Sequence, residues 1–325
     1  MRDCAIIRAV TIPVNVDNFA RAETGRMFRD LQANAGGVNR FRHNRAPAAI
    51  DDQTVIRLNR DTLYSIAVVD LDAGATLTLP DAGDRYLSAM IVNEDHYVTA
   101  IFHEPGQHEL TEEQLGSRYV AVAVRILADP ADQNDIDAVI ALQDQLILTS
   151  GSAEPYAYPD DDTTSLEETR NALLALARNM TVFDGTFGSR DEVNPVRHLI
   201  GTAAGWGGLP SHEASYIGVD PRLPVGQYEL TVGDVPVDGF WSISVYNAKG
   251  FFEPNARHAY SINNITGVKN ADGSTTVRFG DYAEGVANAI PVTEGWNYLV
   301  RLYRPRAEIL DGTWSFPRLD AQPSS

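Results

Sequence analysis

Two short polar segments of the sequence carry the residue types that acid–base chemistry uses. The first covers residues 59–64 and combines the Asn59 amide, the Arg60 guanidinium, the Asp61 carboxylate and the Tyr64 phenol just before an apolar run. An arginine fork can hold a carboxylate through two hydrogen bonds, and a nearby aspartate can act as a base. We predict that Asp61 is catalytic and that Asn59, Arg60 and Tyr64 bind substrate. The alternative is that Arg60 and Asp61 satisfy each other and nearby backbone at the entrance of a strand.

The second polar segment covers residues 93–97 and places two carboxylates and an imidazole at the end of an expected strand. These groups transfer protons or bind hard metal ions. On a strand, Glu94 and His96 face one way while Asn93, Asp95 and Tyr97 face the other, so all five converge only if the chain turns or bulges. We predict that Glu94 and His96 are catalytic, that Asn93 and Tyr97 bind substrate, and that both segments face one cavity. The alternative is a polar strand end in which His96 is hydrogen-bonded.

The C-terminal half concentrates aromatic and amide side chains, which together stack on and hydrogen-bond to sugars or other polar rings. We predict that Trp241, Asn255 and Asn263 bind ligand there. The alternative is that Trp241 packs in a core and that the asparagines make turns.

Several common catalytic and cofactor motifs are absent from the sequence. It has no Gly-Lys-Ser or Gly-Lys-Thr phosphate loop, no Gly-x-Ser-x-Gly elbow and no Gly-x-Gly-x-x-Gly fingerprint. His103 and His108 are five residues apart, with Pro105 and Gly106 between them, which is not the spacing of a helical two-histidine metal site. Cys4 is the only cysteine, so an internal disulfide or a cysteine-based zinc site cannot form. We therefore predict no cofactor and no metal.

The net charge of the chain indicates which macromolecular partners it can bind. Lys and Arg total 26 against 44 Asp and Glu, which gives a formal net charge of −18. This charge is repelled by nucleic-acid phosphates and by an anionic membrane face, so we expect neither as a partner. The apolar run at residues 5–10 is interrupted by Arg8 and is too short for a signal-peptide core. We expect a cytoplasmic protein, or an exported one if a leader has been removed.

Helical spacing is confined to three places, while most of the chain reads as short strands separated by turns. The helices are expected over residues 17–32, from Asp132 to about residue 147, and from a Ser165–Glu168 capping box to about Asn179. The expected strands cover residues 66–71, 75–79, 86–93, 97–102, 119–126, 226–232, 240–247, 274–279 and 297–303. This pattern predicts a mainly β protein with a few helices, built from two β-sandwich or jelly-roll-like modules.

At 325 residues the chain is long enough for two domains. Residues 151–165 are rich in Pro, Asp, Ser and Thr and lack an apolar period, which is typical of a linker. We therefore predict an N-terminal module over residues 1–150, a linker over 151–165 and a C-terminal module over 166–325.

Two long strings resemble known families. Residues 58–97, with the Asp-Thr-Leu-Tyr-Ser block at 61–65 and a strand ending in Val-Asp-Leu, resemble domain of unknown function 1254. Residues 235–255, followed by the Asn-Ala-Asp-Gly-Ser and Asn-Tyr-Leu-Val-Arg stretches, resemble domain of unknown function 1214, its usual partner. The resemblance implies two β-sandwich or jelly-roll modules with helices at their junction.

Two functions remain open from the sequence. The first is a small-molecule-binding protein, for which activity as a cofactor-free acid–base enzyme, a hydrolase, lyase or isomerase, on a polar or anionic substrate stays open. The second is a non-enzymatic carbohydrate-binding or structural protein that assembles as a homo-oligomer. β-Sandwich scaffolds host both classes, so the residues that line a pocket must decide.

Overall fold

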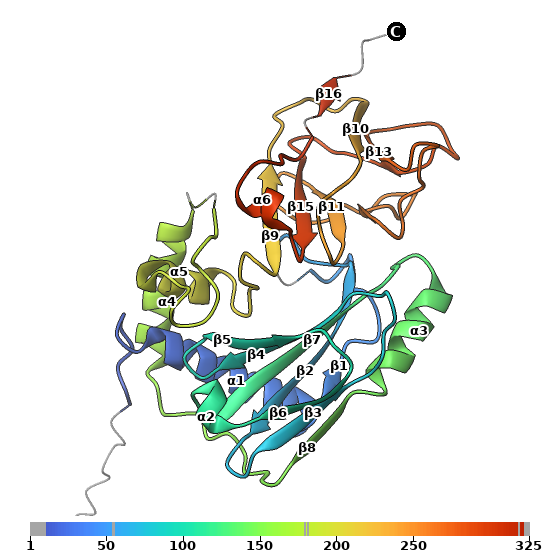
Figure 1. Cartoon of the computed structure of the whole chain (residues 1–325). Coiled ribbons are helices and arrows are strands. Elements are labelled where there is room, and N and C mark those ends of the chain that lie inside the picture. The colour runs from blue at the N-terminus through green and yellow to red at the C-terminus, as the bar shows by residue number, and fades with distance from the viewer. Residues whose placement is uncertain (1–10, 54–55, 179, 181, 318, 322–325) are drawn as a thin grey trace, which may run out of the picture.

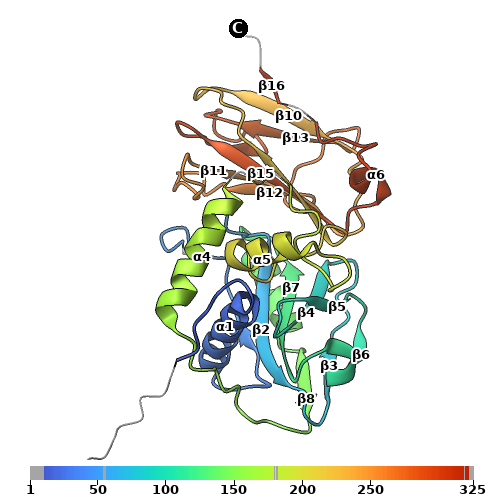
Figure 2. The same ribbon diagram turned by 90° about the vertical axis from the view of Figure 1, so that its left-hand side faces the viewer.

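The computed structural model describes residues 11–321 except 54, 55, 179, 181 and 318, and it is mainly β, as predicted (Figure 1). Cys4 lies outside the described residues. The N-terminal module carries a helical cluster along one side and the C-terminal module at one end (Figures 1 and 2).

The N-terminal module contains two antiparallel sheets. The larger has the strand order β1 (Arg42–His43), β2 (Thr62–Asp70), β7 (Tyr119–Leu127), β4 (Leu87–Asn93) and β5 (Val98–Phe102). The smaller consists of β6 (Gly106–Leu110), β3 (Ala75–Leu79) and β8 (Ile147–Ser150). One apolar core joins the two sheets and also receives α3 (Gln133–Gln143).

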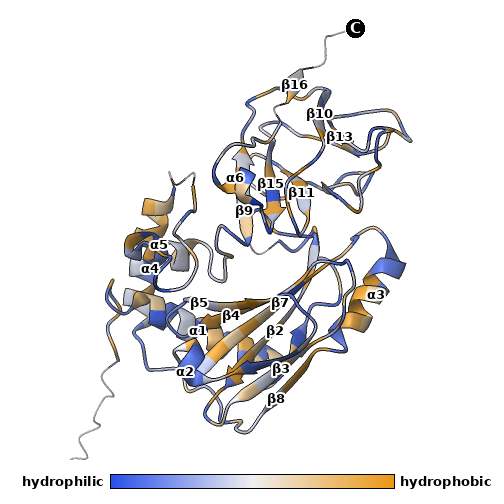
Figure 3. Ribbon diagram, viewed as in Figure 1, coloured by the Kyte–Doolittle hydropathy of each residue, from blue (hydrophilic) through white to orange (hydrophobic). Residues whose placement is uncertain are grey.

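The central strands of the larger sheet are buried on both faces. Every residue of β4 and β7 is buried, and Figure 3 shows these strands as largely hydrophobic. The second face packs against α1 (Phe19–Ala35) and against side chains of the C-terminal module, among them Phe240 and Tyr303. A strand covered on two sides needs apolar residues at successive positions, which explains the uninterrupted apolar runs.

The C-terminal module also contains two sheets with one apolar core between them. One sheet has the order β14 (Ala289–Ile290), β13 (Thr275–Phe279), β10 (Tyr228–Val232) and β16 (Asp320–Ala321). The other has the order β12 (Ser261–Asn263), β11 (Trp241–Tyr246), β15 (Asn297–Tyr303) and β9 (Ala214–Val219).

Helices α1, α4 (Thr163–Ala177) and α5 (Pro195–Ala204) pack together beside the larger sheet (Figure 2). The α4 helix begins earlier than predicted, because Asp162 rather than Ser165 is its N-cap and accepts the Ser165 N–H at 2.8 Å. The predicted second helix was too long, since Ile147 belongs to β8. Two short helices, α2 (Glu112–Leu115) and α6 (Ala307–Leu310), complete the described elements.

Residues 151–165 are part of the N-terminal module and are not a free linker. Gln32 of α1 exchanges two side-chain hydrogen bonds with the backbone of Tyr156, at 2.7 and 2.9 Å. Tyr119 donates to the Glu154 carbonyl at 3.1 Å, and Ile12 pairs with Asp161 as an isolated β-bridge. Because α4 and α5 also pack on α1, the chain enters the C-terminal sheets only after α5. The predicted boundary was therefore too early.

We expect residues 151–165 to resist limited proteolysis of the native chain, because their backbone is held by these contacts. The Tyr156–Ala157 bond offers a site to chymotrypsin, whereas the bonds after Glu154 and Tyr158 precede proline and are resistant in any conformation. Mass spectrometry of early digestion products should place the first cuts elsewhere. Early cleavage at the Tyr156–Ala157 bond would show that the segment is a linker after all.

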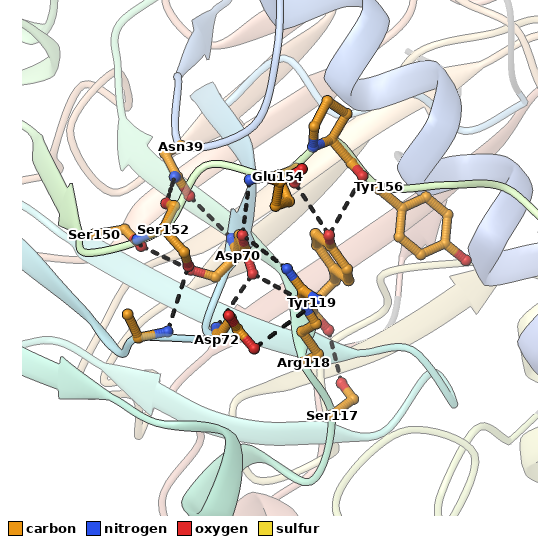
Figure 4. Close-up of polar contacts among 12 residues, drawn as sticks. Asn39, Asp70, Asp72, Ser117, Arg118, Tyr119, Ser150, Ser152, Glu154 and Tyr156 are labelled. Atoms are coloured by element: carbon orange, nitrogen blue, oxygen red, sulfur yellow. Dashed lines mark hydrogen bonds and ion pairs between the residues drawn. The ribbon is translucent and has the colours of Figure 1, made fainter.

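Asp70, the last residue of β2, anchors the same segment (Figure 4). Its buried carboxylate accepts the Arg118 Nε–H at 3.0 Å and the backbone N–H of Glu154 at 2.9 Å. Ser150 donates to the Asp70 carbonyl at 2.8 Å, and Asn39 accepts the Asp70 N–H at 2.9 Å. One residue, through its side chain and its backbone, thus holds two strand ends and the start of the segment together.

Candidate functional site

The two predicted catalytic segments lie at opposite ends of the larger sheet. Both β2 and β4 pair with β7: Thr62 is opposite Leu127, whereas Asn93 is opposite Val120. These two β7 positions are seven residues apart, which corresponds to roughly 24 Å along an antiparallel strand. The expectation that both segments face one cavity was therefore wrong.

Residues 93–97 form a tight turn between β4 and β5, so their side chains do not follow the alternation of a strand. The Asn93 N–H donates to the Tyr97 carbonyl at 3.0 Å, and the Asn93 side-chain oxygen accepts the N–H groups of Asp95 and Tyr97. His96 has a left-handed backbone conformation, with φ of 66°. Asn93 therefore shapes the turn.

His96 is 1% exposed and hydrogen-bonded at both ring nitrogens. The Thr202 hydroxyl donates to the His198 carbonyl at 2.9 Å, so it accepts the proton of His96 Nδ1 at 2.8 Å. The Gly207 N–H donates to His96 Nε2 at 2.9 Å, which requires a neutral ring. Burial, with the neighbouring His198, lowers the pKa of His96 to about 3. His96 joins the turn to α5 and has no free nitrogen for proton transfer.

The remaining residues of this turn contact helices. Glu94 forms an ion pair with Arg21 of α1, which also lies 2.9 Å from Asp95. Burial raises the pKa of Glu94 despite this cation. Tyr97 stacks on His198 at 4.6 Å between ring centroids. These contacts fasten the turn to the helical cluster.

The first segment, in contrast, lies at the junction of the two modules. Asp61 is fully buried, and its Oδ1 accepts the Asn263 amide and the Ser261 hydroxyl, both at 3.3 Å. Its Oδ2 has no hydrogen-bond partner among the described residues. The structure thus brings together Asp61 and Asn263, which were predicted to belong to separate sites.

Arg60 lines a pocket of about 640 Å³ between the modules, named here the junction pocket. Its walls include Ile50, Arg60 and Asp129 from the N-terminal module and Arg257, Tyr260 and Ser261 from the C-terminal module. The Arg60 guanidinium lies 5.5 Å from the centroid of the Tyr260 ring, within cation–π range. It makes no hydrogen bond or ion pair with any described residue. Burial lowers the pKa of Arg60.

Asn255 shapes the wall of the junction pocket without lining it. Its side-chain oxygen accepts the N–H groups of Arg257 and Ala259, and its amide donates to the Ala259 carbonyl at 2.9 Å. Trp241 is 5% exposed and packs in the core of the C-terminal module. It therefore offers no surface on which a sugar ring could stack.

Asn59 and Tyr64 line a different pocket of about 440 Å³, named here the Tyr64 pocket. The Asn59 side-chain oxygen accepts the Asp61 N–H, so its amide nitrogen points to the hydroxyls of Tyr64 and Tyr303, at 3.2 and 3.1 Å. Arg125 of β7 lies 5.4 Å from the centroid of the Tyr64 ring. Arg125 did not appear in the sequence prediction. In the sequence, Arg125 could have been recognised as the one charged residue within the otherwise apolar run of residues 119–127.

The described residues contain no group of three or more His, Cys, Asp or Glu side chains placed to hold a metal ion. No helix in the described part of the chain is long and apolar enough to span a bilayer.

Comparisons with known proteins agree with the resemblance seen in the sequence. The family model described as protein of unknown function (DUF1254) matches residues 38–113, and the model for protein of unknown function (DUF1214) matches residues 223–307. No curated protein matches the chain.

Two crystal structures share the fold over most of the chain. The VPA0106 protein from Vibrio parahaemolyticus is 18% identical with a TM-score of 0.73, over 94% of this chain and 96% of that one. An uncharacterised protein from Burkholderia cenocepacia is 13% identical with a TM-score of 0.52, over 94% and 87% of the respective chains. At these identities the likeness concerns the fold alone.

Proposed function

The chain carries both of these domains of unknown function, 1254 followed by 1214, and we propose that it binds a small anionic molecule in the junction pocket that their pairing creates. Arg60 comes from the first matched region, while Arg257 and Tyr260 come from the second. A volume of about 640 Å³ is in the range of small-molecule sites.

The main support for this proposal is that the Arg60 guanidinium lacks a hydrogen-bonding or ion-pair partner among the described residues. Its guanidinium is half-buried and has no hydrogen bond or ion pair with a described residue, although it borders an open pocket. Partly desolvated cations are normally paired, and a guanidinium fork matches a carboxylate through two charge-assisted hydrogen bonds. A carboxylate bound here would supply the missing partner.

The other lining groups narrow the ligand class. Asp51 and Asp129 also line the pocket and would repel a ligand with several negative charges. Ile50, Pro130 and Tyr260 provide apolar and aromatic surface. A monocarboxylate with a ring or short hydrocarbon body fits these walls best. Asp61 lies behind Ser261 and does not line the pocket, so this proposal concerns binding and assigns no catalytic step to Asp61.

We expect benzoate and phenylacetate to raise the melting midpoint of the full chain, while benzamide and phenylacetamide do not. At ten times the Kd, binding adds about 1.4 kcal/mol, which corresponds to about 3 to 6 °C for a domain of this size. Arg60→Ala should abolish this shift, and Arg60→Lys should reduce it because a lysine cannot make the bidentate contact.

Arg222→Ala is the matched control, since the Arg222 side chain is 87% exposed and outside the pocket. The control should keep the full shift. A carboxylate shift that survives Arg60→Ala, or amides that stabilise as well as the acids, would contradict the proposal.

A further inference from the structure

The Tyr64 pocket contains a phenol whose protein neighbours donate to it. The Asn59 amide orientation is set by the Asp61 N–H, so Asn59 must present N–H to the Tyr64 oxygen. No carboxylate or carbonyl of a described residue accepts the Tyr64 hydroxyl proton; the Thr62 hydroxyl lies beside it, and Tyr64 lines the pocket. A molecule bound in the pocket is therefore placed to exchange a proton with the Tyr64 oxygen.

Arg125 supplies a buried positive charge next to this phenol. It is 7% exposed, donates to the Gly207 carbonyl at 2.9 Å, and forms no ion pair with a described carboxylate. The titratable groups around it are the phenols of Tyr64, Tyr86, Tyr216 and Tyr303. A buried cation without a carboxylate stabilises a negative charge nearby, and Tyr64 is the phenol of this group that opens into the pocket.

The directions of the pKa shifts of these phenols agree with the geometry. Burial raises the pKa of Tyr86, Tyr216 and Tyr303. Burial also acts to raise the pKa of Tyr64, but the Arg125 charge and hydrogen bonds from Thr62 and Asn59 outweigh it, so that the pKa falls below its ordinary value.

Arginines line the Tyr64 pocket. Arg42 is exposed, and its guanidinium makes no ion pair or hydrogen bond with a described residue, whereas Arg45 is paired with Asp144 at 2.5 Å. His43 also lines the pocket, but burial lowers its pKa. In a chain with a net charge of −18, the unpaired Arg42 at this pocket favours a small anion.

We infer that the Tyr64 pocket is a proton-transfer site, in which the Tyr64 phenolate acts as general base on a small carboxylate that carries a C–H bond next to a carbonyl group. Arg42 holds the carboxylate, and Asn59 and Arg125 stabilise the phenolate before the reaction. This site is separate from the junction pocket and stands independently of the function proposed for it.

The step balances without a co-reactant. The C–H bond breaks and the phenol O–H bond forms, while the electron pair moves onto the carbonyl oxygen to give an enolate. Return of a proton from the phenol to carbon restores the substrate, and in heavy water the returned hydrogen is deuterium. Isotope exchange is therefore the simplest observable reaction.

We expect the protein to accelerate deuterium uptake into the methyl group of pyruvate in heavy water, followed by proton NMR. Tyr64→Phe removes only the hydroxyl and should lower the enzymatic rate by about 100-fold or more, which is the usual contribution of a general base. Arg42→Ala should raise the KM for pyruvate with a smaller effect on kcat. Arg222→Ala, at an exposed site, should exchange at the wild-type rate.

A second measurement tests the ionised phenol without any substrate. In an alkaline titration followed by near-ultraviolet absorbance, the wild-type protein should ionise one tyrosine ahead of the others, and Tyr64→Phe should lose that early step. Circular dichroism checks that the variant is folded. Exchange no faster than buffer, equal exchange by wild-type and Tyr64→Phe proteins, or an early step that persists in Tyr64→Phe would each overturn the inference.

Discussion

Lowering the pH from about 6.5 to about 3 is expected to remove on the order of 5 kcal/mol of folding free energy through His96 alone. The unfolded chain protonates this imidazole near its ordinary pKa of 6.5, whereas the folded protein keeps it neutral down to about pH 3. In this window the unfolded state binds one proton more, so stability rises with pH. Above the ordinary pKa the effect is fully absent, and it grows as the pH falls.

His96→Ala should also destabilise the protein by about 3 to 5 kcal/mol at pH 7, because it leaves a buried Gly207 N–H and the Thr202 hydroxyl without their partner. Denaturant unfolding at pH 7 and pH 5 measures both effects. The variant should lose about 2 kcal/mol less than wild type between pH 7 and pH 5.

His212→Ala serves as the control, since this histidine is half-exposed and lies outside the turn. It should change neither the stability at pH 7 nor the slope with pH to a comparable extent. A His96→Ala protein as stable as wild type, with the same pH slope, would show that the imidazole is free rather than structural.

Much of the β framework could be predicted because its signal is local. Alternating and continuous apolar runs placed β3, β4, β7, β10, β11 and β15 within one or two residues of their observed bounds. The α5 helix was missed, since residues 195–204 contain Gly201 and several β-branched residues of low helix propensity. Its glycine is needed for packing: a Cβ there would meet the side chains of Thr186 and Phe187.

Predicting which residues share a pocket required the tertiary contacts of the chain, which a single sequence does not show. The strand register, and not the distance along the chain, decides that residues 59–64 and 93–97 lie at opposite ends of the sheet. Asn59 and Arg60 are adjacent in sequence, yet they line two different pockets. The contact between Asp61 and Asn263 spans 202 positions of the chain. Only the residue types at the first segment were predictable.

Asp70→Ala is expected to lower the unfolding free energy by about 3 kcal/mol, the lower end of the range for breaking a buried charge pair. The lower end applies because Arg118 is 36% exposed and water can solvate its freed charge, whereas the backbone N–H of Glu154 loses its acceptor (Figure 4). For a domain of this size, the melting midpoint should fall by about 6 to 12 °C.

The matched control is Asp72→Ala. Its carboxylate is 60% exposed and lies 3.9 Å from the same Arg118, so its removal should change the midpoint by less than about 2 °C.

Burial acts to raise the pKa of Asp70, but hydrogen bonds from Arg118 and from the N–H groups of Asp72 and Glu154 outweigh this and lower it. The stabilisation by Asp70 is thus complete above the pKa of an unfolded aspartate and is lost as the pH falls below it. The gap between wild-type and Asp70→Ala stabilities should therefore narrow in acid, below about pH 4. A gap that stays constant down to pH 2, or an Asp72→Ala protein as unstable as Asp70→Ala, would show that the buried carboxylate is not what holds residues 151–165 to the sheet.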